Sequence, residues 1–338
     1  MKKPRPEVSI REVASLVGVS TATVSNALRG KGHVSQATTA RIVAAVDKLG
    51  YVPNVAASQL RQGYSKVFGV AVMNIANPFF SEIVLGVEEV AEVTDYSVVV
   101  GNSYNSAKRE ANYLSLFERH RYDGVLLAPT LDELPNLDGF ARRGTPVVLI
   151  DHVDPTGGHI CVSVDDLLGG RLAAEHLLAG GARHVAFVGD PQRLPQMRGR
   201  CQGCADAVTG IGARFTVIET PPLTVRTGRE AGHHLSGLPL VDRPDAVLCG
   251  NDEGALGLMQ ALIADNVSIP DEIALVGYDD IDFASTAIVP LTSLRQPSHQ
   301  MGVRAAELLL GSIAGEAGLE SVRFQPELVV RRSTRSYV

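Results

Sequence analysis

From Val67 onward, the sequence alternates short apolar runs with longer amphipathic stretches. Runs such as VFGVAVM (67–73) and DGVLLA (123–128) are too short for helices and are bounded by polar residues, which is typical of buried strands. The stretches between them have helical spacing, and Asn77-Pro78 provides a cap and first residue for one such helix. This alternation predicts parallel sheets with right-handed helical crossovers, an α/β fold. The predicted strands are 67–73, 97–101, 123–128 and 146–150, then 184–189, 214–219, 245–249 and 272–277, with helices near 79–94, 107–120, 136–143, 166–180, 197–209, 226–236 and 252–265.

Because the strands fall into two similar sets, we expect two doubly wound lobes in tandem. The chain after residue 290, with a strand at 292–295, a helix at 298–313 and a strand at 323–331, must pack on one lobe or cross back. In open α/β sheets, ligands bind at the carboxyl ends of the strands. Polar side chains that suit a small polar ligand follow the predicted strands: Asn74, Asn77, Asn102, Tyr104, Asp151, Asn251, Asp252, Tyr278 and Asp279.

The segment from Ile10 to Gly30 predicts two short helices joined by a tight turn. Ser9 and Glu12 form a capping-box pattern, Gly18 permits a left-handed end to the first helix, and Ser20 can cap a second helix over 21–28. The side of that helix away from the core carries Thr21, Ala22, Ser25, Asn26 and Arg29. This layout fits a helix-turn-helix whose second helix enters the DNA major groove, but spacing alone also allows an ordinary helical hairpin in a core. Ser35 caps a third predicted helix, 36–49, with Ile42, Val43, Val46 and Leu49 facing inward.

The charge distribution favours the DNA interpretation. Residues 1–62 carry nine Lys or Arg and three acidic residues, a formal charge of +6, whereas the remainder carries 22 basic and 34 acidic residues, −12. A basic head suits contact with phosphate, and an acidic body does not.

A short helix is predicted at 55–61, after Asn54. It contains Ala56, Ala57 and a single Leu60, and a helix this short forms only when something holds it. Small residues around one exposed Leu are unusual in a linker but suit a wedge in a DNA minor groove.

Other function classes find little support. The chain has four Cys, and Cys201-x-x-Cys204 without a second pair or a nearby His indicates two small residues one helical turn apart. No Gly-rich phosphate loop follows a strand, and the adjacent carboxylates suit turns or caps better than acid–base chemistry. We therefore expect no enzyme activity, no metal and no cofactor. With no apolar stretch that could span a bilayer and no secretory signal, we expect a cytoplasmic protein.

At this level of detail the chain resembles the LacI/GalR family of bacterial transcription regulators. The resemblance runs from Ser9 to about Arg331 and rests on IREVASLVGVSTATVSNALRGKGHVS, GYVPNVAASQLR, NPFFSEIVLGVEEVA, Asn251-Asp252 and VGYDD (276–280). It implies a helix-turn-helix domain (1–53), a hinge helix and linker (54–65), and a two-lobed periplasmic-binding-protein-like body (66–338). The first lobe would comprise about 66–163 plus 292–325, and the second about 164–291 plus 326–338.

The resemblance also implies a homodimer that binds double-stranded operator DNA as a repressor. Bases would be read by Thr21, Ala22 and Asn26, with Asn26 able to pair bidentately with adenine. Ala57 and Leu60 would enter the minor groove. Phosphates would be met by Ser20, Ser25, Arg29, His33, Ser35 and Asn54.

The family's effector shell maps onto Asn74, Phe79, Asp151, Arg200, Asn251, Asp279 and Gln296. Arg200 would donate to adjacent hydroxyls or a carboxylate, whereas Arg198 is expected at a solvated helix end. The ligand implied is small and polar, a sugar or sugar derivative, although the chain has no Trp to stack on a sugar ring and has Cys204 where many members have an aromatic residue. Dimer contacts would come from 79–94, 252–265 and 281–289. A transporter-type solute-binding protein shares the two-lobed body but predicts a signal peptide and no basic head.

Overall fold

A computed structural model describes residues 8–28, 32–51 and 64–335. The chain divides into two compact units, Met1–Tyr64 and Ser65–Val338. The helix predicted at 55–61 lies outside the described residues.

The first unit contains the three predicted helices: α1 (Ile10–Val17), α2 (Thr21–Leu28) and α3 (Gln36–Leu49). The Glu12 carboxylate accepts a 2.6 Å hydrogen bond from the Ser9 backbone N–H, and Gly18 has φ 73°, as the sequence predicted. Their shared core includes Val13, Val17, Val24, Ile42 and Ala45. One inward residue was predicted wrongly: Val43 is exposed, and Ala45 is buried in its place.

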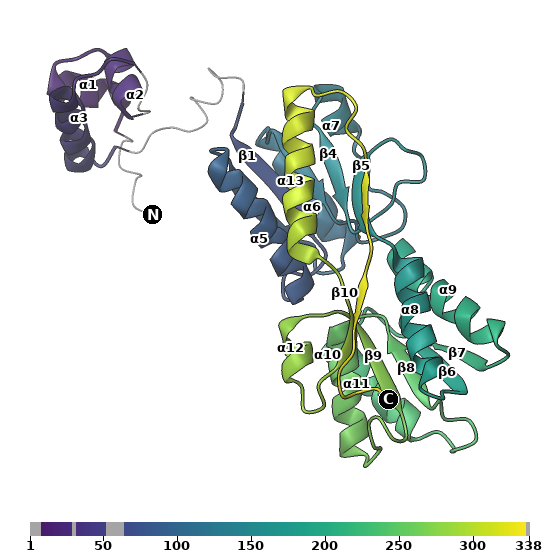
Figure 1. Ribbon diagram of the computed structural model, residues 1–338. Helices are drawn as coiled ribbons and strands as arrows, with labels where there is room; N and C mark the ends of the chain where they lie inside the picture. The colour runs from purple at the N-terminus through teal and green to yellow at the C-terminus, as the bar shows by residue number, and fades with distance from the viewer. Residues whose placement is uncertain (1–7, 29–31, 52–63, 336–338) are drawn as a thin grey trace. The chain divides into compact units, whose positions relative to one another are not determined.

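The second unit is built on two six-stranded sheets, each with helices on both faces (Figure 1). The first sheet has the order β11-β5-β4-β3-β1-β2, and all of its strands are parallel. Its strands are β1 (Val67–Val72), β2 (Ser97–Asn102), β3 (Gly124–Leu127), β4 (Val147–Ile150), β5 (Ile160–Val164) and β11 (Val322–Phe324). β5 was not predicted, because its ICVSV sequence mixes small and polar residues.

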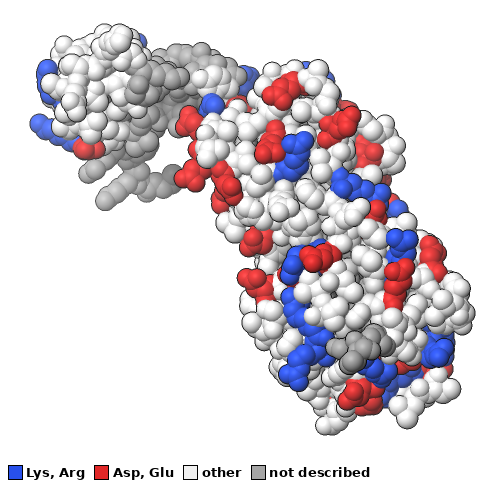
Figure 2. All heavy atoms as spheres, in the orientation of Figure 1, with Lys and Arg blue, Asp and Glu red and all other residues white. Residues whose placement is uncertain are grey.

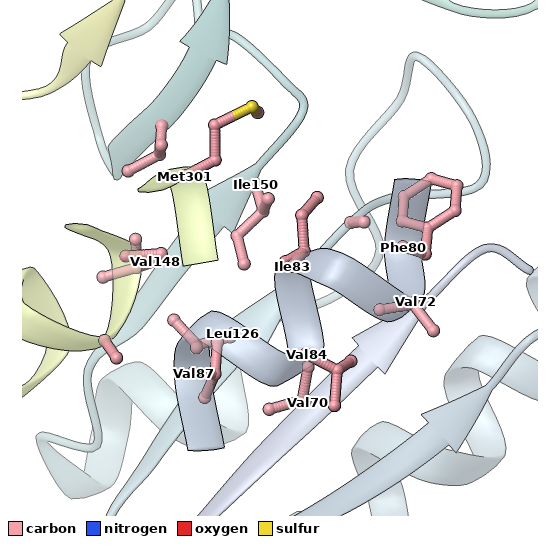
Figure 3. Close-up of a cluster of buried hydrophobic side chains, with 14 of the residues drawn as sticks. Val70, Val72, Phe80, Ile83, Val84, Val87, Leu126, Val148, Ile150 and Met301 are labelled. Carbon is pink, nitrogen blue, oxygen red and sulfur yellow. The ribbon is translucent and has the colours of Figure 1, made fainter. Parts of the chain in front are cut away.

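Two helices that lie far apart in the sequence cover one face of the first sheet. α5 (Pro78–Val93) and α13 (Ser298–Ala314) pack side by side, and the resulting core includes Val70, Ile83, Leu126 and Met301 (Figure 3). The other face packs against α6 (Ala107–Arg119) and α7 (Asp138–Arg143).

The second sheet has the order β12-β10-β9-β8-β6-β7, with only β12 antiparallel. Its strands are β6 (His184–Val188), β7 (Arg214–Ile218), β8 (Ala246–Cys249), β9 (Ala274–Asp279), β10 (Thr292–Arg295) and β12 (Glu327–Val329). Its helices are α8 (Asp166–Ala179), α9 (Pro195–Gly210), α10 (Val225–Ser236), α11 (Asp252–Ala264) and the short, unpredicted α12 (Asp282–Thr286).

One predicted lobe boundary is wrong. The segment from residue 292 was assigned to the first lobe, but β10 pairs with β9 in the second sheet. The side chains of β10 explain its position, because Ser293 Oγ donates to Asp252 at 2.7 Å and Thr292 Oγ1 lies 2.8 Å from Thr334 Oγ1. The chain returns to the first lobe only after β10, where α13 begins.

The single strand predicted at 323–331 is two strands in different sheets, β11 and β12. They are separated at Gln325-Pro326, where proline has no N–H for a ladder. The chain thus passes between the lobes three times: after β5, after β10 and after β11.

Candidate functional site

A cleft between the two lobes lies at the carboxyl ends of the strands. The cavity volume of this cleft is about 80 Å³. The structure brings six of the seven predicted effector residues to this cleft: Asn74, Phe79, Asp151, Arg200, Asn251 and Asp279.

The seventh predicted residue, Gln296, lies behind the wall of the cleft. It is 3% exposed, and its Nε2 donates to Asp279 Oδ1 at 2.7 Å. Gln296 therefore supports Asp279 and does not itself line the cleft.

Asp151 follows β4 with a left-handed backbone, φ 52°. Such a conformation is costly for a non-glycine residue and is common at functional sites. Its Oδ2 accepts a 3.1 Å hydrogen bond from Gln196 Nε2 of the other lobe, while the buried Oδ1 has no partner among the described residues. Burial raises the pKa of Asp151 to about 8.

Arg200 is a buried hub on α9, only 3% exposed. Its Nε donates to Asp166 Oδ1 at 2.8 Å, its Nη1 donates to the Gly250 carbonyl at 2.7 Å, and its guanidinium lies 3.7 Å from the centroid of the Tyr278 ring. Much of the hydrogen-bonding capacity of the Arg200 guanidinium, which the sequence analysis assigned to the ligand, is therefore used within the protein.

Asp279, at the end of β9, also has a positive φ, 113°. Its carboxylate accepts from Gln296 and, at 3.5 Å, from Asn77 Nδ2 of the other lobe. Burial raises the pKa of Asp279 to about 6. Asp252, proposed among the strand-end polar residues, is fully buried, and its carboxylate accepts from Ser293 Oγ and the Ile281 N–H, a structural role.

Three buried polar atoms in residues that line the cleft have no hydrogen-bond partner among the described residues: Asp151 Oδ1, Gln196 Oε1 and Arg193 Nε. Leaving such atoms unpaired costs free energy, so they favour a ligand with hydroxyl groups, which both donate and accept. Apolar side chains complete the wall, and one of them is Phe79, which is 4% exposed. They are Met73, Phe79, Phe80, Leu194, Met197 and Leu223.

Sequence reasoning missed a group of residues around the start of α9. Asp190, Arg193 and Gln196 line the cleft, and so does Glu253 at the start of α11. The segment VGDPQRLP directly follows β6, so its position after a strand end was the signal that could have found them.

The same segment holds the lobes together. Arg193 Nη2 donates to the Asn105 carbonyl at 2.9 Å, and Arg198 Nη2 lies 2.7 Å from Asp132 Oδ2. Arg198 is half-exposed, as predicted for a helix end, but it makes an ion pair across the lobes.

The pair Cys201 and Cys204 forms no disulfide in this structure. Cys201 and Cys204 are buried on α9 as free thiols, and burial raises their pKa values to about 11 and 12. No cluster of metal-ligating side chains occurs within the described residues.

In the first unit, α2 carries the predicted base-reading residues. Thr21 and Ala22 are exposed, whereas Asn26 and Ser25 are half-buried. The hydroxyls of Ser20 and Ser35 serve as N-caps that accept from Thr23 N–H at 3.1 Å and Thr38 N–H at 3.2 Å. His33 is exposed. The other predicted DNA contacts, Arg29, Asn54, Ala57 and Leu60, lie outside the described residues.

The two units differ in the charges that they expose. On the face drawn in Figure 2, acidic and basic side chains are interspersed over residues 65–335. Arg11, Arg41 and Lys48 are exposed on the three-helix unit.

In the segments 8–28, 32–51 and 64–335, no helix is long and apolar enough to cross a membrane.

Comparison with known proteins agrees with this geometry. Residues 9–54 match the family of bacterial regulatory proteins, lacI family, and residues 174–334 match a periplasmic binding protein-like domain. The ribose operon repressors of Bacillus subtilis and Escherichia coli K12 are 31% and 33% identical, each over 96% of this chain and 98% and 99% of their own lengths.

Solved structures show the same fold. A Lac repressor dimer bound to operator is 27% identical with a TM-score of 0.82, over 98% of this chain and 100% of that one. A LacI family regulator from Enterococcus faecium with bound ribose is 27% identical with a TM-score of 0.71, over 79% and 98%. The chain therefore belongs to the LacI family of bacterial regulators, which are ligand-controlled DNA-binding transcriptional repressors.

Proposed function

We propose that this protein is a homodimeric, cytoplasmic repressor whose operator affinity is set by a small carbohydrate bound between its lobes. The observation that carries the proposal is the cleft itself. It joins an apolar wall to buried, unpartnered polar atoms on Asp151, Gln196 and Arg193. A sugar ring has an apolar face and a rim of hydroxyls, so it suits both parts of this lining. Several relatives are ribose operon repressors, and one related structure holds ribose.

The mechanism is linkage between two sites. Three hydrogen bonds or ion pairs cross the cleft near α9: Arg193–Asn105, Gln196–Asp151 and Arg198–Asp132. A ligand that favours one angle between the lobes would change the separation of the paired hinge segments in a dimer and so shift operator affinity. No cofactor and no catalytic step enter this proposal.

Dimer contacts are proposed on the outer face of helix 79–94 and on the segments 252–265 and 281–289. Exposed apolar side chains occur there: Leu85 and Val93 on α5, and Phe283 and Ile288 near α12. Burying them against a second copy would remove apolar surface from water.

Two experiments test the function. Purified protein should select a preferred sequence from a genomic fragment library at moderate salt, and the absence of any preference would contradict DNA recognition. A thermal-shift screen of sugars, nucleosides and small acids should identify a ligand that raises the melting temperature and changes operator affinity.

Leu60→Ser tests the hinge prediction. We expect specific operator binding to weaken far more than non-specific binding, because a wedge acts only at the central base step. Binding of operator and random DNA is compared by titration at one salt concentration. Equal losses on both DNAs would contradict the wedge.

A further inference from the structure

The charges around the cleft are unbalanced. Four carboxylates line it, those of Asp151, Asp190, Glu253 and Asp279, against two guanidinium groups, those of Arg193 and Arg200. Two more buried carboxylates, Asp166 and Asp252, lie close by, and their charges act on the lining residues.

Of the two guanidinium groups, Arg200 is paired with carboxylates, whereas Arg193 has no ion pair among the described residues. The Arg200 guanidinium lies against Asp166 and also 4.0 Å from Asp279 Oδ1. Arg193 uses Nη2 for the Asn105 carbonyl, leaving Nε as its buried unpaired donor. A carboxylate or phosphate in the cleft would therefore meet the positive charge of Arg193 alone, against the carboxylates of Asp190, Glu253 and Asp279.

Two of the three unpartnered atoms of the lining are oxygens, and the third is the Arg193 Nε donor. Asp151 Oδ1 and Gln196 Oε1 are both oxygen atoms, each in a residue that is 5% exposed. A hydroxyl can donate to such an atom, whereas an anion at neutral pH brings further acceptors. Like charges in a site of low dielectric repel by several kcal/mol, far more than in water.

We propose, on the basis of the proposed sugar-controlled function, that the cleft selects an uncharged polyol and excludes its phosphorylated and carboxylated counterparts. The ionised carboxylates of the lining set this selectivity. Burial raises the pKa of Asp151 to about 8, so this carboxyl is largely neutral at pH 7, and the negative charge of the lining comes from Asp190, Glu253 and Asp279.

The experiment is calorimetric titration of the full-length protein with matched probes: D-ribose, D-xylose and D-glucose against D-ribose 5-phosphate, D-glucose 6-phosphate and the corresponding sugar acids. We expect at least one neutral sugar to bind at least about 100-fold more tightly than its own anionic derivatives. An anionic probe that binds as tightly as its parent would overturn the selectivity and leave the proposed sugar-controlled function intact. If no probe binds while operator binding is normal, the sugar effector and this selectivity both fail.

A variant separates charge from shape. Asp190→Asn with Glu253→Gln removes two negative charges from the lining with little change in size. We expect the ratio of neutral to anionic affinity to narrow about tenfold. The control, Asp206→Asn with Glu175→Gln, removes the same charge from exposed positions on α8 and α9 and should leave the ratio unchanged. An unchanged ratio in the lining variant, or an equal change in both, would contradict control by these carboxylates.

Discussion

Arg200 and Arg198 are two residues apart on α9 but lie in opposite environments. Arg200 is 3% exposed and bound to the buried Asp166, whereas Arg198 meets Asp132 with about half of its side chain in water. Removing one partner of a buried ion pair leaves an uncompensated charge, but an exposed pair contributes little.

Arg200→Ala should therefore destabilise the protein by roughly 3–5 kcal/mol and abolish the effector response. Arg198→Ala should cost about 0–1 kcal/mol. Urea unfolding of both variants measures the difference. Similar losses in the two variants would show that Arg200 is not the buried hub that its contacts indicate.

Asp151 should make the stability of the protein fall as pH rises. Its carboxyl retains a proton up to a pKa of about 8 in the folded state, whereas an unfolded Asp releases it near its ordinary pKa of 3.8. Between these values the folded state binds more protons at Asp151, so the contribution of this residue to stability falls as pH rises.

Asp151→Asn should flatten this dependence, with the variant gaining roughly 1–3 kcal/mol relative to the wild type between pH 6 and pH 9. Denaturant unfolding at both pH values provides the measurement. Glu320→Gln, which removes an exposed carboxylate, serves as the control. A pH profile identical for Asp151→Asn and wild type would rule out this titration.

At the level of elements, the close contact between α8 and α9 positions the site. A β-carbon at Gly170 would overlap the carbonyl oxygen of Arg200, and one at Gly203 would overlap that of Leu167. These glycines let the two helices approach backbone to backbone, and that approach fixes where Arg200 lies.

Gly170→Ala should force α9 outward, destabilise the protein by about 1–3 kcal/mol and weaken effector binding. Gly210→Ala is the matched control, since a β-carbon there meets nothing within 4 Å. That substitution should be neutral or slightly stabilising. Thermal unfolding and ligand titration of both variants test the packing, and an unaffected Gly170→Ala would contradict it.

At the scale of the whole molecule, the proposed dimer is open to a direct test. Ile288→Asp should shift the sedimentation coefficient from dimer to monomer and weaken operator binding, because it places a charge in an apolar contact. Leu240→Asp changes a side chain with the same 78% exposure as Ile288 but outside the predicted contact segments, and it should remain dimeric. A dimeric Ile288→Asp variant would place the interface elsewhere.

The sequence alone determined the features that depend on local interactions. Caps at Ser9, Ser20, Ser35 and Asn77, left-handed glycines and apolar periodicity specify helices and strands within a few residues of themselves, so their positions were predicted closely. The resemblance then named six of the residues that line the cleft.

Only the tertiary structure decided which lobe contains β10 and that β11 and β12, on either side of Gln325-Pro326, lie in different sheets. It also decided how many hydrogen-bond donors of Arg200 remain for a ligand. These outcomes depend on partners such as Asp252 and Asp166, which are distant in sequence. Hydrogen bonds and ion pairs of this kind leave no periodic signal in the chain, because their energy arises only when the folded structure buries both groups together.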